Sequence, residues 1–288
     1  MRHAFDADHI AAIDNATRTL HGEGKPTTSV GFWFALGHST VVVATVGLLA
    51  LGVHFLVAAV QDDSSAFRQA AGLWGVSVSV LLVLAFGIVN LQSLARLVRA
   101  HRRAAPGSTN ARQTDAGDPV SHTPTGPLFR LFLPITRLVD RPSRMYPLGF
   151  LFGLGFDTAA TIGLFVTAGV ASMQVSWALA AALPLLFTAG MSLFDTLDGA
   201  LMSRLYGWAT EGSIRAIRYN IVVTGLSVAA AFVVVTVGVS QILGDNVFSG
   251  FAVPIDTGGL GFVIVGVFLL VGLAAALVRL GRQHRPGR

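Results

Sequence analysis

The sequence predicts an all-α fold: a polytopic membrane protein with six full transmembrane helices preceded by a shorter polar helix. Hydrophobic residues make up 53% of the 288 residues and only 12% are charged, whereas a soluble domain carries about 25% charged residues. The mean hydropathy is +0.66. Several apolar segments reach the ~20 residues that a helix needs to cross ~30 Å of hydrocarbon. These observations place the chain in a lipid bilayer.

The helices are expected in the following order. A shorter polar helix at about 4–19 comes first, and six apolar segments follow it, at roughly 30–58, 73–98, 147–171, 176–203, 217–243 and 259–279. Glycine is abundant, with 32 residues, which favours close packing of membrane helices through small side chains. Pro184 falls inside a span, where neighbouring helices can satisfy the backbone group that proline frees.

Basic residues are concentrated in alternate connections between the spans. They occur in the loop 99–146, in the loop 204–218, in the C-terminal tail, and in the short connection 18–29, which contributes Arg18 and Lys25. The other connections are acidic or neutral. Since cytoplasmic loops carry an excess of Lys and Arg, we expect the basic connections to face the cytoplasm and the chain to lie in the cytoplasmic (inner) membrane.

The large basic loop divides the chain into three regions: an N-terminal membrane half at 1–98, a cytoplasmic loop at 99–146 and a C-terminal membrane half at 147–288. The loop is rich in Pro, Gly, Ser and Thr and lacks apolar periodicity, which indicates partial disorder. Topology explains the net charge of +5, so no nucleic-acid partner is predicted. The absence of cysteine excludes disulfides and thiolate metal sites.

Ionisable side chains within membrane helices are costly and mark functional sites. The opening stretch RHAFDADHI holds His3, Asp8 and His9 in an H-x4-D-H spacing. On a regular helix His3, Asp6 and His9 share one face, and Asp8 points elsewhere. Asp14 is interpreted as a residue at the cytoplasmic end of the same helix.

Three further clusters lie in the spans. His38 occurs in LGHSTVVV, Asp157 in GLGFDTAATIG, and Asp195 and Asp198 share a helix face at i, i+3 in GMSLFDTLDGALM. A hydrogen bond between helices is the alternative explanation for a lone histidine such as His38. Without matching Lys or Arg in the spans, such carboxylates would protonate unless a cation joins them. We therefore expect a metal ion or protons to supply the missing charge.

The types of side chain narrow the choice of metal. Imidazole with carboxylate and no thiolate suits Ni, Co or Zn, whereas Ca and Mg prefer oxygen ligands alone. Met1 and Asp6 are additional candidate ligands. If Met1 is the true start, its α-amino group, two backbone amides and His3 can wrap Ni²⁺ in a square-planar chelate. An earlier start with a further helix upstream is the alternative.

Four motifs, RHAFDADHI, LGHSTVV, LGFDT and GMSLFDTLDG, resemble in order and spacing the signature motifs of the nickel/cobalt transporter (NiCoT) family. The resemblance covers residues 2–199. It implies a secondary permease that takes up Ni²⁺ or Co²⁺ as its transported substrate and needs no cofactor; members of the family have eight helices. It also implies a metal site made of the motif residues His3, Asp8, His9, His38, Asp157, Asp195 and Asp198.

The chain departs from the family pattern in two places. Thr161 stands where the third motif usually carries a glutamate, which removes a carboxylate one turn beyond Asp157 and is expected to alter affinity or ion preference. By the resemblance, the helix that opens this sequence corresponds to the one that is normally second in the family, and we expect the family's first helix to be lacking.

Two other functions fit parts of the sequence. An efflux exporter of the wider superfamily is the first alternative, but such exporters carry a long His-rich cytosolic loop, and the loop here holds only His101 and His122, both interpreted as solvated. The second is an intramembrane aspartyl protease, because GLGFD resembles G-x-G-D and two aspartates can share a proton. Its spacing differs by one residue and it leaves the histidines without a role. The prediction is a transporter and not an enzyme, with the nickel or cobalt preference and the oligomeric state left open.

Overall fold

The computed structural model describes residues 2–50, 66–103, 139–154, 177–207, 214–246 and 259–283. Within these ranges every regular element is a helix, which confirms the all-α prediction. Four of the described helices are long and apolar enough to cross a bilayer. The chain is therefore a multi-pass membrane protein.

The elements follow the predicted order. They are η1 (Arg2–Phe5), α1 (Ala7–Gly22), α2 (Val30–Ala50), α4 (Ala66–Arg103), η2 (Pro142–Arg144), α6 (Met145–Gly153), α8 (Trp177–Gly207), α9 (Ile214–Asn246) and α10 (Leu260–Gln283). Each predicted span overlaps one of the six helices α2, α4, α6, α8, α9 and α10. Residues 51–58 and 155–171 of those spans lie outside the described residues, as does most of the predicted loop 99–146.

The N-terminal segment differs from the prediction of one helix at 4–19. Residues Arg2–Phe5 form a 3-10 turn, Asp6 has an extended backbone (φ −67°, ψ 136°), and α1 begins only at Ala7. An Asp that precedes a helix commonly takes this non-helical conformation. The prediction of one regular helix through His3, Asp6 and His9 was therefore wrong, because α1 begins only after Asp6.

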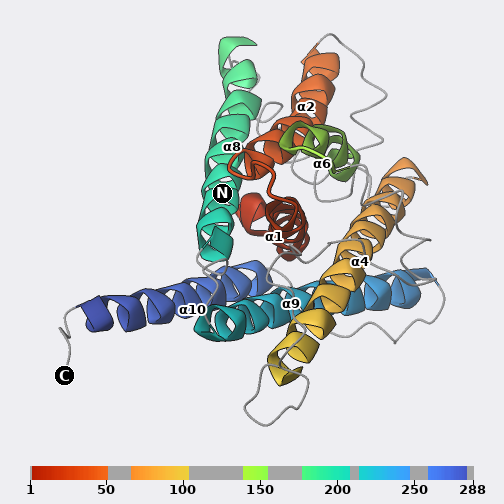
Figure 1. Cartoon of the computed structure of the whole chain (residues 1–288). Coiled ribbons are helices and arrows are strands. Elements are labelled where there is room, and N and C mark those ends of the chain that lie inside the picture. The colour runs from red at the N-terminus through yellow and green to blue at the C-terminus, as the bar shows by residue number, and fades with distance from the viewer. Residues whose placement is uncertain are drawn as a thin grey trace.

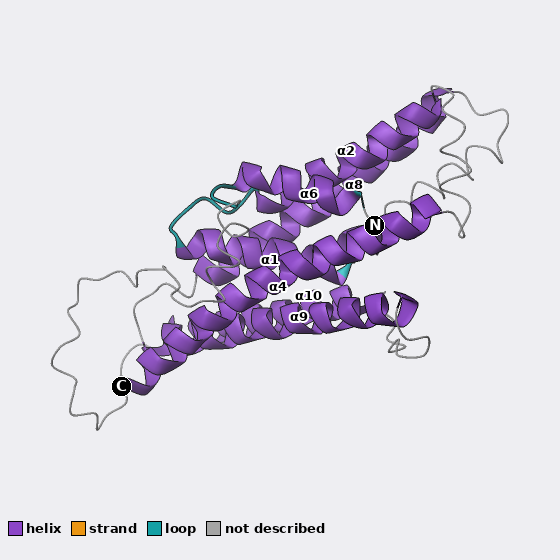
Figure 2. Cartoon of the chain, turned by 90° about the vertical axis from the view of Figure 1, so that its right-hand side faces the viewer, coloured by secondary structure: helices purple, strands orange, loops and turns teal. Residues whose placement is uncertain are grey.

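Helix α1 lies at the centre of the molecule. It packs between α2 and α8 on one side and α4, α9 and α10 on the other, while α6 packs on α2 (Figure 1). The same layering is visible from the side (Figure 2). Ile13 of α1 belongs to a core shared with α2, α4, α6 and α8, and Ile10 belongs to a core shared with α4, α8, α9 and α10. A short, polar helix is thus enclosed by apolar ones.

Two glycines allow the backbones of neighbouring helices to touch. A Cβ atom on Gly31 of α2 would lie 1.7 Å from the carbonyl oxygen of Asp195 in α8, and one on Gly261 of α10 would lie 1.6 Å from the carbonyl oxygen of Phe5. Membrane helices commonly pack through such small residues. Large apolar side chains point outward instead, for example Leu186 (69% exposed) and Leu270 (68% exposed), as expected for surfaces that face lipid.

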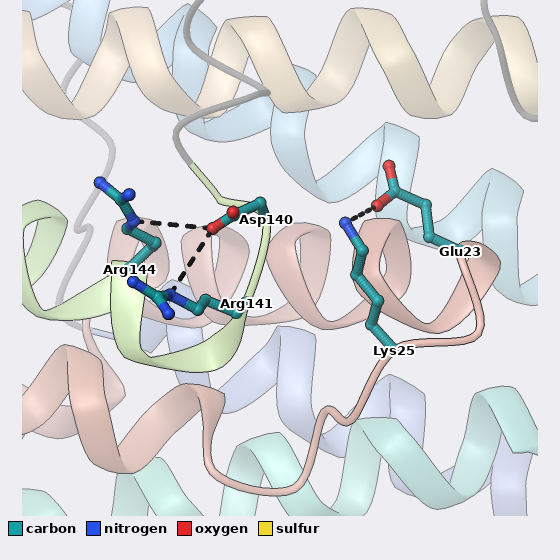
Figure 3. A network of polar contacts seen from close by, with 5 residues as sticks. All are labelled: Glu23, Lys25, Asp140, Arg141 and Arg144. Carbon is teal, nitrogen blue, oxygen red and sulfur yellow. Dashed lines mark ion pairs between the residues drawn. The ribbon is translucent and has the colours of Figure 1, made fainter.

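The described loops carry exposed ion pairs (Figure 3). Lys25 Nζ lies 2.6 Å from Glu23 Oε2 just after α1, and Asp140 Oδ1 lies 3.6 Å from Arg144 Nε before α6. Arg18, which the charge count placed in the connection 18–29, lies inside α1 and is only 9% exposed. Counting Arg18 among the loop charges was therefore wrong, because the helix continues to Gly22.

Candidate metal site

The two histidines of the first two motifs are in contact. His9 of α1 and His38 of α2 have ring centroids 4.8 Å apart, with one ring edge against the other's face. Both side chains are buried. The rings of Phe34 and Phe152 pack against His9 at 5.1 and 5.8 Å. Two imidazoles from different helices are thus held together in a largely aromatic, dry setting.

The carboxylates of the first motif lie where α1 begins. Asp6 occupies the position before the helix, and Asp8 lies in its first turn, where its Oδ1 accepts a 2.9 Å hydrogen bond from the backbone N–H of His9. The first N–H groups of a helix lack partners in the helix and favour nearby negative charge. Asp8 therefore helps to fix the start of α1, which also fixes the position of His9.

The paired aspartates of α8 are buried and unsatisfied. Asp195 is 1% exposed, and both carboxylate oxygens of Asp195 and of Asp198 are shielded from solvent without a hydrogen-bond partner among the described residues. Asp6 and Asp198 are close enough to act electrostatically on Asp195. Burying a charged carboxylate is unfavourable unless a donor or a cation compensates it. This pair has the chemistry of a cation site.

Helices α2 and α8 connect the histidines to the carboxylates. The Ser39 hydroxyl, next to His38, donates to the Met191 sulfur at 3.7 Å. Met191 lies one turn before Asp195 on α8. Gly31 brings the backbone of α2 onto that of Asp195 itself. The two pairs therefore belong to one packed unit of α1, α2 and α8.

The predicted ligands whose side chains the structure describes do not gather into one compact cluster. Within the described part of the chain, no group of three or more His, Asp or Glu side chains is close enough to hold a metal ion. The structure brings His9 to His38, and Asp195 to Asp198 and Asp6. Met1, Asp157, Thr161 and the side chain of His3 lie outside the described residues. The donor types fit a transition-metal ion, and the described donors are arranged as two separate pairs.

Sequence reasoning missed a second polar cluster on the next turns of α1. Asp14 is 1% exposed, and its Oδ1 accepts a hydrogen bond from the Tyr206 hydroxyl of α8. The Tyr206 hydroxyl is also 2.8 Å from Ser227 Oγ of α9. The interpretation of Asp14 as a residue at a helix end was therefore wrong. The sequence feature that could have predicted this cluster is the presence of isolated polar residues, such as Ser227, in apolar spans.

Arg18 belongs to the same cluster. Its guanidinium carbon lies 5.4 Å from the centroid of the Tyr206 ring. This buried arginine, one turn beyond Asp14, also overturns the expectation that no basic residue accompanies the buried aspartates. In the sequence, Arg18 was assigned to the connection 18–29, and it was therefore not expected to be a partner of the buried aspartates.

An amide pair attaches α1 to α4 nearby. Asn90 Nδ2 donates to Asn15 Oδ1, and Asn15 Nδ2 donates to the Ala11 carbonyl at 2.6 Å. Both asparagines are at most 2% exposed. Buried amides with satisfied donors and acceptors hold helices in one register.

Comparison with known proteins gives a consistent result. The family model described as high-affinity nickel-transport protein (NicO) matches residues 1–280. The nickel transporter NicT of Mycobacterium tuberculosis is 40% identical over 96% of this chain and 75% of its own length. The high-affinity nickel-transport protein NixA of Helicobacter pylori is 37% identical, over 95% of this chain and 83% of its own. The cobalt transport protein NhlF of Rhodococcus rhodochrous is 35% identical, over 96% and 79%. No solved structure matches.

Proposed function

Since the chain belongs to the family of high-affinity nickel-transport proteins, we propose that it is a permease that carries Ni²⁺ or Co²⁺ inward across the cytoplasmic membrane. The observation that carries the proposal is the buried Asp195–Asp198 pair, whose oxygens accept no hydrogen bond from the described residues. A divalent cation would compensate the negative charge of such a pair.

The proposed ligands are the motif residues, each with its own role. His9 and His38 supply imidazole nitrogens, which select transition-metal ions over Ca²⁺ and Mg²⁺. Asp195 and Asp198 supply negative charge inside the membrane. Asp8 positions α1 at its start. The set is completed by the residues that the motifs alone assign: His3 and Asp157.

Two separate donor pairs suit a transporter better than a storage site. An ion that is carried must bind well enough to enter and weakly enough to leave. The histidine pair and the aspartate pair lie on different helices. A small movement of α1 against α8 therefore changes how many side chains bind the ion at one time. We accordingly propose transport rather than catalysis as the function.

Membrane potential is a sufficient driving force for the proposed uptake. Moving one charge across 100 mV is worth about 2.3 kcal/mol. A divalent ion therefore gains about 4.6 kcal/mol, which corresponds to roughly three decades of accumulation. The proposed uptake therefore does not need to be coupled to the flow of a second ion when the metal is scarce outside the cell.

Accumulation of radioactive nickel and cobalt by cells that express the chain tests the proposal. Cells with the wild-type chain should accumulate either metal above the vector control, and Asp195→Asn should return accumulation to that control. Asp140→Asn, a change at an exposed carboxylate, should leave uptake unchanged. Export would instead lower cellular metal below the vector control, which would refute uptake. No difference from the vector, with the protein inserted, would refute transport.

A further inference from the structure

The Asp14 cluster, formed by Asp14, Arg18, Tyr206 and Ser227, lies outside the motif residues assigned to the metal. Its other members surround the carboxylate of Asp14. The Tyr206 hydroxyl donates to Asp14 Oδ1, and the face of the Tyr206 ring meets the guanidinium of Arg18 at 5.4 Å. Tyr206 thus contacts the negative and the positive member of the cluster at once, and Ser227 anchors its hydroxyl to α9.

The charges of this cluster are buried and only partly compensated. Arg18 Nη1 and Asp14 Oδ2 are both shielded from solvent and have no hydrogen-bond partner among the described residues. Asp14 and Arg18 nevertheless act electrostatically on each other across one helical turn. A carboxylate oxygen that is buried and still has an unused lone pair can accept another cation.

The cluster is aligned with the metal site along α1. At a rise of about 1.5 Å per residue, Asp14 lies about 7.5 Å beyond His9 and Arg18 about 13.5 Å beyond it. Asp14 is close enough to Asp198 to act on it electrostatically. Past Arg18 come the ring of His21, 6.4 Å from that of Tyr206, and the exposed Glu23–Lys25 pair.

We propose that Arg18 is the inner gate of the transporter: a tethered cation, one helical turn from Asp14, that competes for this carboxylate with an ion leaving Asp195 and Asp198 on its way to the end of α1. This inference rests on the proposed function. Asp14 is then the next carboxylate on the route, and Tyr206 holds it in place while Arg18 competes for it.

In this arrangement the charge of Arg18 lowers the affinity for the metal ion and speeds its release. A fixed positive charge near a divalent ion weakens the binding of that ion, because few charges screen it in a buried setting. Removing the charge of Arg18 should therefore tighten nickel binding. It should also slow transport, because the ion is retained at Asp14 when no tethered cation replaces it there.

The test uses the purified full-length chain, with equilibrium binding of nickel in detergent and nickel flux into proteoliposomes at a fixed membrane potential. Arg18→Met should bind nickel at least about tenfold more tightly and show a lower maximal flux. Arg18→Lys keeps the charge and should bind like the wild type. Lys25→Met, which removes an exposed basic residue just beyond α1, should change neither quantity. A defect of folding alone would weaken binding and flux together.

A second pair of variants covers the case in which Arg18→Met fails to insert because Asp14 is left alone. Asp14→Asn should weaken nickel binding, since the charge of Arg18 then acts on Asp198 without compensation. Adding Arg18→Met to Asp14→Asn should restore it. Unchanged affinity on loss of Arg18 in both backgrounds would overturn the gate while wild-type flux still supports transport. A wild-type chain that carries no nickel would refute the proposed function itself.

Discussion

His9 of α1 and His38 of α2 lie with their ring centroids 4.8 Å apart, edge to face, although the two residues come from different motifs and different helices. Phe34 packs between the same two helices, with its ring 5.1 Å from that of His9 and 6.4 Å from that of His38. Apolar rings hold imidazoles in place without competing for a metal ion. The contact therefore places the imidazoles of two helices side by side.

Removing either histidine should abolish the function proposed for this contact. We expect His9→Ala to lower nickel accumulation at least about tenfold. Loss of a residue that orients a metal ligand already lowers metal affinity about tenfold or more, and loss of the ligand itself should cost at least as much. Uptake at low external nickel measures it, with membrane-inserted protein quantified in parallel. His101→Ala, near the end of α4, is the matched control and should retain uptake. Wild-type uptake by His9→Ala would remove His9 from the site.

Neutralising Asp195 should stabilise the metal-free protein and abolish its response to nickel. A buried carboxylate without a donor destabilises the fold, so Asp195→Asn should raise the melting temperature in chelator. Nickel at 100 times the dissociation constant should stabilise the wild type by about 2.7 kcal/mol and leave Asp195→Asn unchanged. Thermal unfolding in detergent, with and without nickel, measures both effects. A variant that nickel still stabilises would show that the ion binds elsewhere.

The contact between α2 and α8 should not tolerate a side chain at Gly31. A Cβ there would lie 1.7 Å from the carbonyl oxygen of Asp195, so Gly31→Ala must separate the two helices. We expect a loss of folded protein and of uptake. Gly47→Ala provides the control on the same helix, since nothing lies within 4 Å of its Cβ. Size-exclusion chromatography compares the amount of folded protein in the two variants. Equal profiles would contradict the close contact between α2 and α8 at Gly31.

The Asn15–Asn90 pair should couple α1 to α4 energetically. Truncating each residue to Ala and then both gives a double-mutant cycle, in which we expect a coupling of about 0.6 kcal/mol and at most about 1.7 kcal/mol, as for other polar pairs between membrane helices. Reversible unfolding in detergent with a chemical denaturant supplies the free energies. A coupling of zero would show that each amide acts separately.

The orientation of the chain can be tested independently of the metal. The basic residues of the loop 99–146 and of the tail predict that both face the cytoplasm. A reporter enzyme that is active only in the cytoplasm should work when fused after Arg288, and one that is active only outside should not. Since Arg18 is buried, the prediction now depends on Lys25 and the arginines of the larger loops. External activity of the fusion would invert the topology and with it the direction of the gate.

The sequence by itself determined the fold class, the order of the helices and the family, because these properties are local. Hydropathy over about 20 residues is enough to recognise a membrane helix, and each predicted span overlaps a described helix. The motif residues could be named for the same reason, since a carboxylate or an imidazole in an apolar segment is conspicuous wherever it packs.

Only the tertiary structure decided which of these residues meet. His9 reaches His38, and Asp14 reaches Tyr206, across positions far apart in the chain, through helix contacts that depend on Gly31 and similar residues. The backbone is extended at Asp6, so the first motif does not lie on one regular helix. Arg18 looked like a loop residue and is a buried charge, because the enclosing helices, rather than its neighbours in sequence, determine its exposure to solvent.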